Sequence, residues 1–455
     1  MPTNDAARRR QFRRVASSSF IGSAIEYYDF LLYGAAASLV FNELFFTGLD
    51  PVTGTIASFA TLAVGYVARP LGGIVFGHFG DKVGRKSMLV LTMTLMGLSS
   101  FVIGLLPTYD TIGVWAPVLL VAARLVQGVA VGGEWGGAAL MALEHAPANR
   151  RGLAASFANM GGPAGAVLAT AVLGLFSALP EEQFLSWGWR VPFLLSILLL
   201  AFGMFIRLKV TESPVFAEAQ AHDRRTGAKR KAPLFTALRR YPKNIALAAF
   251  GGVGALVLQS LLATFVLSHA LDLGYQRSTV LTAQTMSSAL HIFTIPAFAL
   301  LSDRIGRKPV MITGALASAA AAFPLLALVN SGSTGLLFLA FVIGNPLLQA
   351  SMYGPMAAFI SEMFGTRARY TGASLGYQLA STLGAGVAPL LATTLLASAG
   401  GGTHTATVSL FLLVVCLISA GAIALTKEGK DTDLDAESAP PTTQETPHSV
   451  RANTV

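Results

Sequence analysis

Long apolar runs recur along the chain and are separated by short polar joints. Each run has about 20 or more residues and lacks the strict alternation of a half-buried strand, so it is long enough to cross a bilayer as a helix. A helix also satisfies its own backbone hydrogen bonds in lipid. We predict twelve transmembrane helices, with bounds loose by several residues, near 17–42, 55–80, 87–106, 114–142, 152–178, 187–208, 244–270, 277–302, 309–329, 334–361, 370–398 and 405–426.

The composition supports a membrane protein. Hydrophobic residues make up 53% of the chain and charged residues 12%, whereas a soluble domain carries about 25% charged residues. The net charge of +9 does not indicate a nucleic-acid partner, because the basic residues cluster in joints between apolar runs. The only cysteine, Cys416, lies inside an apolar run, so no disulfide forms within one chain.

The distribution of Lys and Arg predicts the orientation. Nearly all of them lie in alternate joints and at the termini, and the exceptions are Arg69, Arg124, Arg190 and Arg277. The opposite joints carry acidic residues, namely Glu43, Asp50, Asp110, Glu181, Glu182 and Asp272. Because cytoplasmic loops are enriched in Lys and Arg, both termini are expected in the cytoplasm, as an even number of spans requires.

The longest joint divides the predicted helices into two sets of six. We expect a cytoplasmic N-terminal tail over 1–16, a six-helix bundle over 17–208, a cytoplasmic linker over 209–243 and a second bundle over 244–426. Residues 427–455 are polar, acidic and rich in Pro and Thr, which predicts a disordered cytoplasmic tail.

Two pairs of segments repeat across the linker. GHFGDKVGRK at 77–86 matches ALLSDRIGRK at 299–308, and EHAPANRRGLAAS at 144–156 matches EMFGTRARYTGAS at 362–374. The offset is 303 − 81 = 222 positions in the first pair and 362 − 144 = 218 in the second. A nearly constant offset predicts duplicated six-helix halves, with a substrate site between them at mid-membrane depth.

The repeated joint resembles the loop motif of the major facilitator superfamily. Further stretches resemble its metabolite:proton symporter family, which includes shikimate, α-ketoglutarate, citrate and proline/betaine permeases. They are IGSAIEYYDFLLYG at 21–34, VARPLGGIVFGHFGD at 67–81, RLVQGVAVGGEWGGAALMALEHAP at 124–147, SWGWRVPFLLS at 186–196 and ESPVF at 212–216. The resemblance implies an all-α membrane protein with the major facilitator fold, in which twelve transmembrane helices form two six-helix bundles.

The resemblance also implies a cytoplasmic latch that favours an outward-open state. Its residues would be Gly77, Asp81, Gly84, Arg85, Lys86 and Glu144 in the first half, and Asp303, Gly306, Arg307, Lys308 and Glu362 in the second. Ala299 replaces the leading glycine in the second copy. Glu144 and Glu362 end helices within reach of Arg85 and Arg307, and the joint Asp residues suit helix ends and ion pairs. The alternative is that these charges only fix the topology.

Two acids lie near the middle of the first span. Glu26 and Asp29 are three residues apart and share one helix face, about 15 Å into the span at 1.5 Å per residue. Acids at this depth are costly, so they are expected to face a water-filled cavity and to carry a proton. The resemblance implies that Asp29 pairs with Arg124 of the fourth span in proton coupling. A fixed salt bridge and direct ligation of substrate remain alternatives.

Other polar residues are candidates for the substrate site. Asn345, Gln349 and Tyr353 recur every four residues on one helix face. Tyr27, Tyr28, Gln259 and Tyr377 are expected to line the same cavity, with Arg69 and Arg124 binding a carboxylate. For each polar residue singly, helix packing is the alternative. GGPAGAVLA at 161–169 predicts a small-residue seam against the first span or its symmetry mate.

The roles of three residues stay open. Glu134 lies among Gly132, Gly133, Gly136 and Gly137, where it handles protons or substrate or bonds a neighbouring helix. Arg69 either meets a substrate carboxylate or pairs with Glu134. His291 titrates near neutral pH in water, but a single membrane His usually satisfies an interhelical bond.

These patterns favour transport over catalysis. The sequence holds no GxSxG, HExxH or P-loop motif and no paired Cys/His ligands, so no enzyme activity, cofactor or metal is expected. We predict a monomeric symporter of the bacterial-type cytoplasmic membrane that imports a small carboxylate, shikimate-like or dicarboxylic, with protons by alternating access. The alternatives are a proline/betaine symporter, an uncoupled uniporter and a membrane sensor.

Overall fold

The computed structural model describes residues 3–83, 85–132, 143, 150–208, 238–365 and 369–430. Side chains are described from residue 17 onward within these ranges, with gaps at 18, 77–87, 89, 206–208 and 370. The regular structure in these ranges is entirely helical. Glu134, Gly84 and Glu144 lie outside the described residues.

The first half contains five long helices and a sixth that is interrupted. They are α1 (Thr3–Leu39), α3 (Pro51–Val83), α4 (Arg85–Leu105), α6 (Trp115–Val131) and α8 (Arg151–Ser177), followed by α9 (Glu181–Gln183), a π turn (Phe184–Gly188), α10 (Arg190–Leu194) and α11 (Ser196–Leu208). Short α2 (Phe41–Phe45) and α5 (Tyr109–Ile112) lie in the connections.

The second half repeats the plan with three π turns inside its spans. Its helices are α14 (Pro242–Ser260), η3 (Leu261–Phe265), α15 (Val266–Asp272), α16 (Arg277–Ile305), α17 (Arg307–Asn330), α18 (Thr334–Val342), η4 (Ile343–Gln349), α19 (Ala350–Glu362), α20 (Arg369–Ser381), η5 (Thr382–Gly386), α21 (Ala388–Ser398) and α22 (Ala406–Ala424).

Each of the twelve predicted runs has a helix in the structure. Among the described residues, nine helices are long and apolar enough to cross a membrane, and Val90–Leu105 and Trp115–Val131 are shorter apolar helices. The first run lies within α1, which begins at Thr3, so residues 3–16 continue this helix. The sixth span begins at Glu181 rather than near 187, because Pro180 precedes it and two acids in its first turn favour a helix start.

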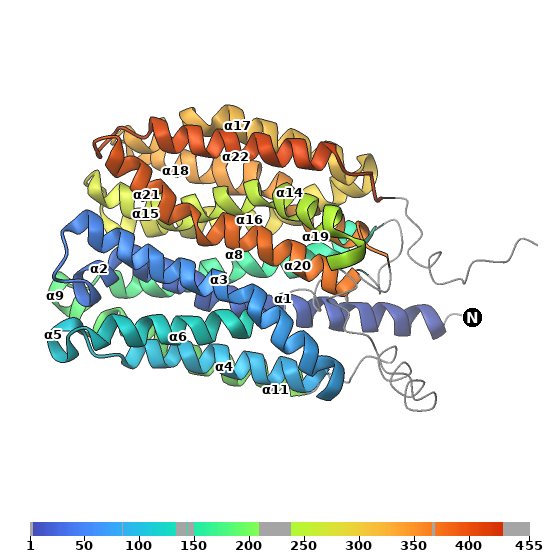
Figure 1. Cartoon of the computed structure of the whole chain (residues 1–455), viewed down its shortest axis with the longest axis horizontal. Coiled ribbons are helices and arrows are strands. Elements are labelled where there is room, and N and C mark those ends of the chain that lie inside the picture. The colour runs from blue at the N-terminus through green and yellow to red at the C-terminus, as the bar shows by residue number, and fades with distance from the viewer. Residues whose placement is uncertain are drawn as a thin grey trace, which may run out of the picture.

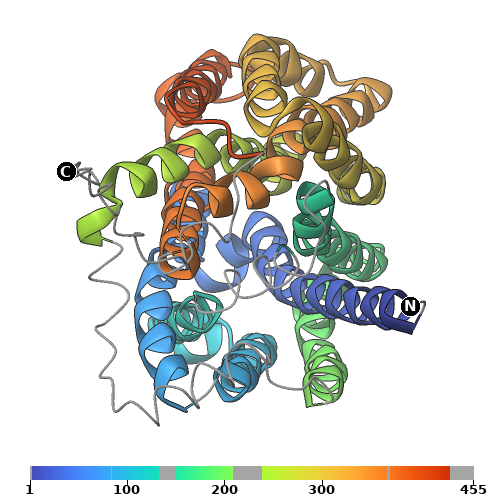
Figure 2. The ribbon, with the colours of Figure 1, turned by 90° about the vertical axis from the view of Figure 1, so that its right-hand side faces the viewer.

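The helices of the two halves lie side by side along one long axis. In Figure 2 the helices of residues 3–208 form one group and those of 242–424 the other, and α1 extends beyond the bundle in Figure 1. Across the boundary α8 packs on α16 and α19, and α3 packs on α20 and α21. Within the first half the predicted 161–169 seam is confirmed, because a Cβ on Gly165 would lie 2.5 Å from the Ala24 carbonyl oxygen of α1.

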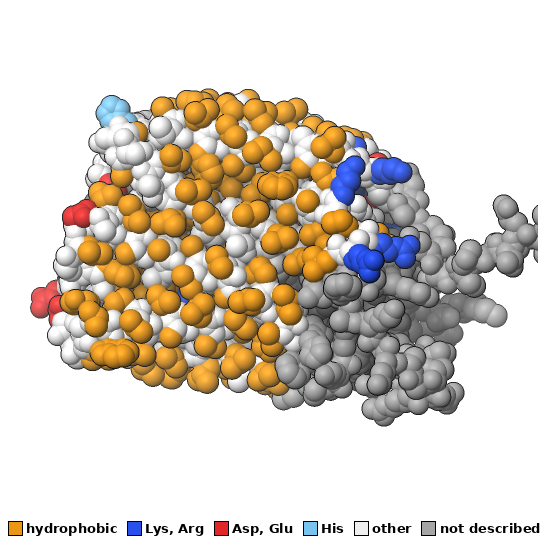
Figure 3. All heavy atoms as spheres, in the orientation of Figure 1, with side chains coloured by type: hydrophobic (Ala, Val, Ile, Leu, Met, Phe, Trp, Pro, Cys, Tyr) orange, Lys and Arg blue, Asp and Glu red, His pale blue; other side chains and the backbone are white. Residues whose placement is uncertain are grey.

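Charge separates to the two ends of the bundle (Figure 3). The acidic end includes the connections after α1, α4 and α8, which hold the exposed residues Glu43, Asp50, Asp110, Glu181 and Glu182. The basic end includes the junction of α16 and α17 and the segment after α22, which hold Arg304, Lys308, Lys427 and Lys430. Large apolar side chains are exposed on the belt between these ends, among them Leu175, Phe293 and Leu71. Such a belt suits lipid, and this is a multi-pass membrane protein.

Candidate functional site

A cavity lies between the two halves. Its walls are formed by α1, α3, α14, η3, α20 and η5. The lining residues are Tyr27, Phe30, Leu31, Gly34, Leu62, Tyr66, Arg69, Leu256, Gln259, Ser260, Ala263, Thr264, Tyr377, Ser381 and Ala385. Four predicted substrate residues, Tyr27, Arg69, Gln259 and Tyr377, are therefore brought together from both halves.

Three other predicted substrate residues do not line this cavity. Asn345, Gln349 and Tyr353 are buried, although Gln349 approaches Gln259 with an amide-to-carbonyl distance of 3.5 Å. Asn345 and Gln349 lie in η4, a π turn over Ile343–Gln349, and Tyr353 lies in α19, so the spacing of these residues along the helix differs from that of a regular α-helix. Tyr28 also points elsewhere, since its hydroxyl donates to the Pro192 carbonyl oxygen at 2.7 Å.

Three tyrosine hydroxyls meet at one edge of the cavity. The hydroxyl oxygen of Tyr27 lies 2.7 Å from that of Tyr353 and 2.6 Å from that of Tyr377. Tyr27 belongs to α1 in the first half, and its two partners belong to α19 and α20 in the second. Both α1 and α20 start at the basic end, so these three residues, the tyrosine cluster, close the cavity on the basic side. Asn159 strengthens the contact by donating to the Tyr353 carbonyl oxygen at 2.8 Å.

Arg69 is the cation of the cavity wall. It is 3% exposed, its Nη1 donates to the Ser381 hydroxyl at 3.1 Å, and its Nε has no hydrogen-bond partner. Its guanidinium carbon lies 4.2 Å from the ring centre of Tyr66 and 3.9 Å from that of Phe30. Among the described residues no carboxylate forms an ion pair with it, so its charge is stabilised chiefly by aromatic rings.

Arg124 is fully buried behind the cavity wall. Its Nη1 donates to the Gln127 side-chain carbonyl oxygen, and Gln127 in turn donates to the Ser100 hydroxyl at 2.7 Å. Its Nε and Nη2 have no hydrogen-bond partner. The guanidinium fits because position 65 is glycine: a Cβ there would lie 2.4 Å from the Arg124 Nε.

The predicted ion pair between Asp29 and Arg124 is absent from this conformation of the described chain. Asp29 is 1% exposed and accepts a 2.6 Å hydrogen bond from the Ser196 hydroxyl of α11, while Arg124 bonds Gln127. Their side chains thus take other partners, although their charges still interact. Asp29, Glu26 and Arg124 are not among the residues that line this cavity.

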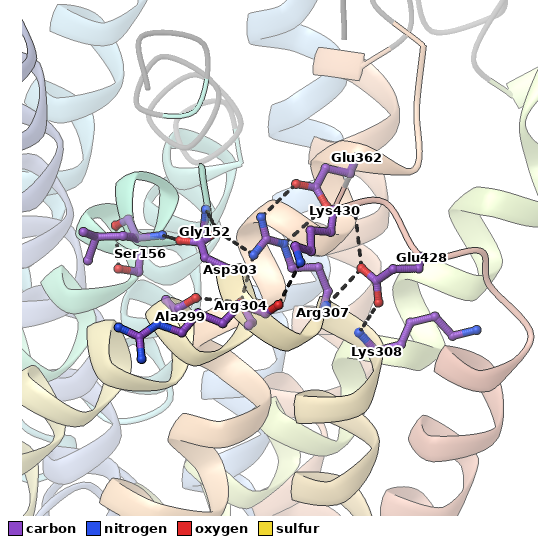
Figure 4. Close-up of polar contacts among 12 residues, drawn as sticks. Gly152, Ser156, Ala299, Asp303, Arg304, Arg307, Lys308, Glu362, Glu428 and Lys430 are labelled. Carbon is purple, nitrogen blue, oxygen red and sulfur yellow. Dashed lines mark hydrogen bonds and ion pairs between the residues drawn. The ribbon is translucent and has the colours of Figure 1, made fainter. Parts of the chain in front are cut away.

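The repeated joint of the second half forms a buried ion-pair cluster (Figure 4). Arg307 Nη1 lies 2.6 Å from Asp303 Oδ1, and Arg307 Nη2 lies 3.2 Å from Glu362 Oε1. The Asp303 carboxylate also accepts hydrogen bonds from the backbone N–H groups of Gly152 at 2.9 Å and Leu153 at 3.0 Å. These are free N–H groups in the first turn of α8, where an anion is favoured. Asp303 therefore fastens the second half to the first.

Glu428 completes this cluster and was missed from the sequence. Its carboxylate accepts 3.0 Å hydrogen bonds from the backbone N–H groups of both Arg307 and Lys308, which start α17. The turn before α17 relies on Gly306, whose φ of 104° suits glycine. Lys308 and Lys430 donate to the carbonyl oxygens of Thr426 and Arg304, at 2.5 and 2.7 Å. The predicted tail therefore begins too early, because residues 427–430 dock on the joint.

The equivalent joint of the first half is described only in part. Gly77, Asp81, Arg85 and Lys86 lie in α3 and α4, but their side chains lie outside the described residues, as do Gly84 and Glu144 entirely. At the acidic end the halves are joined by the ion pair of Arg277 with Glu181 at 2.7 Å and by the Ser38 hydroxyl donating to the Thr264 carbonyl oxygen at 2.9 Å. Contacts between the two halves thus occur at both ends of the bundle.

His291 is buried and does not line the cavity. It is 3% exposed, and its Nε2 has no hydrogen-bond partner.

Known protein families match both halves of the chain. A family described as "Sugar (and other) transporter" matches residues 15–233, and one described as "Major Facilitator Superfamily" matches residues 248–452. The shikimate transporter of Escherichia coli (strain K12) is 42% identical over 426 residues, which cover 92% of this chain and 95% of the relative. The chain belongs to the metabolite:proton symporter family of the major facilitator superfamily.

Other members and folds agree with this assignment. The glycine betaine/proline/ectoine/pipecolic acid transporter OusA of Dickeya dadantii (strain 3937) is 36% identical over 397 residues, covering 85% of this chain and 78% of the relative. The proton:xylose symporter XylE bound to 6-bromo-6-deoxy-D-glucose superposes with a TM-score of 0.72 at 17% identity, covering 94% and 98% of the two chains. The predicted major facilitator fold is confirmed, and this facilitator is a transporter rather than an enzyme.

Proposed function

We propose that this facilitator imports a small hydroxylated carboxylate together with protons, by alternating access to the cavity between its halves. The observation that carries the proposal is Arg69, a buried cation on the cavity wall whose Nε lacks a partner. A guanidinium binds a carboxylate through paired N–H donors. A bound carboxylate would neutralise the charge of Arg69 more fully than the rings of Phe30 and Tyr66 do.

The other polar groups of the cavity favour hydroxyl groups on the same solute. Tyr27, Tyr377, Ser381 and Gln259 are neutral donors and acceptors placed around Arg69. Shikimate has this chemistry, one carboxylate and three hydroxyls on a ring, and it is named in the shikimate transporter of E. coli. We therefore take shikimate-like acids as the first substrate class to test.

A betaine is the second candidate, because OusA is named for such solutes. Quaternary ammonium groups are recognised by open aromatic faces. Here the guanidinium groups of Arg69 and Arg124 already occupy the rings of Phe30 and Tyr66 at 3.9 to 4.2 Å. This occupation disfavours a second cation in the cavity.

Proton coupling is assigned to Asp29 with Arg124, assisted by Glu26 and, outside the described residues, Glu134. A carboxyl group buried at mid-membrane depth is costly to ionise unless a cation compensates it. Asp29 now accepts from Ser196, and Arg124 retains two unpartnered nitrogens. Approach of Arg124 to Asp29 in another conformation would favour loss of the proton there.

The joint cluster supplies the switch between conformations. Asp303, Arg307 and Glu362 hold the basic end closed through the start of α8. The tyrosine cluster closes the same side of the cavity. Release of both contacts would open the basic end, which we place at the cytoplasm of a bacterial inner membrane from its Lys and Arg content. The transport unit is a monomer.

Proteoliposomes test this function directly. With an acidic exterior, radiolabelled shikimate should accumulate inside above the external concentration, and a protonophore should abolish the accumulation. Arg69→Gln should remove uptake, whereas Arg304→Gln, an exposed residue of the basic end, should not. Equilibration without accumulation would indicate a uniporter. A thermal-shift screen in which betaine stabilises the protein and carboxylates do not would favour the second candidate.

A further inference from the structure

Phe30 lies between two buried arginines. Its ring centre is 3.9 Å from the guanidinium carbon of Arg69 and 4.0 Å from that of Arg124. Two guanidinium groups at these distances do not fit on one face of a ring, so they cover opposite faces. In the described part of the chain, this ring is the one that contacts both cations.

The two arginines belong to different compartments of the protein. Arg69 lines the cavity and donates to Ser381 of the second half. Arg124 is sealed behind the wall and bonds Gln127. Phe30 itself lines the cavity, so it is the partition between the proposed anion site and the proposed proton site.

We propose that Phe30 is the positioning residue that couples occupancy of the anion site at Arg69 to protonation of Asp29 through Arg124. This inference rests on the proposed function and assigns a role to a residue with no titratable group. It explains how a substrate that never reaches Asp29 would still affect its proton.

The sign of the coupling follows from repulsion between the two cations. The charge of Arg69 repels Arg124 across the ring and so weakens its hold on the described position, which favours movement toward Asp29, whose ionised form Arg124 stabilises. A carboxylate bound to Arg69 neutralises the charge of Arg69. Arg124 then stays against the Phe30 ring, and Asp29 keeps its proton. Substrate and proton then favour each other's binding, as a symporter requires.

Few other charges disturb this arrangement. The titratable groups that interact with Arg124 are Tyr33, Tyr66, Arg69 and Asp29. Arg124 also lies over the Tyr33 ring at 4.2 Å, which holds its other side. Tyr28 and Arg124 are the titratable groups that interact with Asp29, and the hydroxyl groups of Ser196 and Ser100 lie against its carboxylate. Phe30 is thus the contact through which neutralisation of Arg69 would alter the position of Arg124.

Substitution of the ring tests the proposal. Phe30→Leu keeps an apolar side chain without an aromatic face, and Phe30→Tyr keeps the face. In proteoliposomes, Phe30→Leu should lower the ratio of proton-driven accumulation to shikimate counterflow, which needs no net proton movement, by about fivefold or more. Phe30→Tyr should retain both. Phe45→Leu is the matched control, since Phe45 is a buried ring that packs on Phe41 and Trp189.

Two outcomes of the transport assay would overturn the role. One is normal accumulation by Phe30→Leu, and the other is loss of counterflow in proportion to accumulation, which a purely structural effect would produce. The design also separates this inference from the proposed function. If wild-type protein does not accumulate shikimate, the substrate proposal fails, whatever Phe30 does.

A second measurement needs no substrate. Hydrophobic carbodiimides label protonated carboxyl groups, and fragment mass spectrometry separates Asp29 from Glu26. The labelling of Asp29 in Phe30→Leu should fall off at a pH about one unit lower than in wild type, a tenfold change in proton affinity, because Arg124 is freed toward the acid. Phe45→Leu should label like wild type. If the pH midpoint of Asp29 labelling is the same in Phe30→Leu as in wild type, the inference is overturned, even if shikimate is not transported.

Discussion

The Asp303 carboxylate accepts a hydrogen bond from the backbone N–H of Gly152 at 2.9 Å, so an acid of one half docks on the first helical turn of the other. The N–H of Leu153 donates a second hydrogen bond at 3.0 Å, and Arg307 forms an ion pair with the same carboxylate. A single side chain therefore links the joint of the second half to α8.

Replacement of Asp303 should loosen the basic end. Hydrogen bonds to a charged group are worth about 1.5–3 kcal/mol, so Asp303→Asn should shift the population toward opening by roughly 10-fold or more. A cysteine introduced at Asn159, near the tyrosine cluster, should then react faster with a thiol reagent supplied at the basic end. The native Cys416 is buried and free, so it contributes little background. Asp110→Asn at the acidic end serves as control, and equal reactivity in both variants would refute the latch.

Loss of Arg307 should be the most destabilising change at the joint. Its partners Asp303 and Glu362 are nearly inaccessible, and removal of one member of a buried ion pair costs about 3–5 kcal/mol. Arg307→Gln should therefore unfold at a markedly lower temperature in detergent. Arg304→Gln is the matched control, because Arg304 lies in the last turn of α16, three residues before Arg307, and is exposed. Similar melting temperatures for the two variants would contradict the cluster's energetic role.

A methyl group at position 65 should displace Arg124. The added Cβ of Gly65→Ala would lie 2.4 Å from the Arg124 Nε and 2.9 Å from its Cδ. Overpacking costs about 1–3 kcal/mol, and the guanidinium must leave its ring contacts. We expect weakened proton-driven uptake with protein still in the membrane. Gly174→Ala, whose Cβ would have only one neighbour, at 3.9 Å, should behave as wild type.

The tyrosine cluster should respond to loss of a single hydroxyl. Tyr27→Phe removes the oxygen that both Tyr353 and Tyr377 contact. At about 1 kcal/mol per hydrogen bond, shikimate binding should weaken by roughly fivefold, as measured by thermal shift. Tyr28→Phe is the control, because its hydroxyl bonds Pro192 within the first half. A larger effect from Tyr28→Phe would place the substrate elsewhere.

Stability at the acidic end should depend on Glu43. Partial burial, and then the charge of Glu181, raises the pKa of Glu43, while Arg277 lowers it. The ionised carboxylate therefore opposes folding above its raised pKa, and this opposition disappears as the pH falls through that value toward the pKa of the unfolded chain. Glu43→Gln should raise the melting temperature at pH 7.5 but not near pH 4. An equal gain at both pH values would mean that charge is not the cause.

The architecture could be predicted from the sequence because each membrane-spanning helix requires an apolar run of about 20 residues. Twelve runs and their division at the linker follow from hydropathy alone, and Arg69 and Tyr27 were recognisable as polar groups at mid-depth. The bond between Asp303 and α8 and the cap from Glu428 were not, because both join residues more than 100 positions apart. Phe30 carried no signal either, since an apolar residue in an apolar run looks like core.

The π turns of the second half change how its sequence must be aligned. A π turn holds one residue more than the α turn it replaces, so helical wheels drawn through η3 or η4 assign wrong faces to every later position. Removing one residue within Ile343–Gln349 would restore a regular helix and rotate the segment before it by about 100°, a turn that follows from 3.6 residues per turn. A one-residue gap in an alignment at these points would therefore reflect helix winding and not loop length.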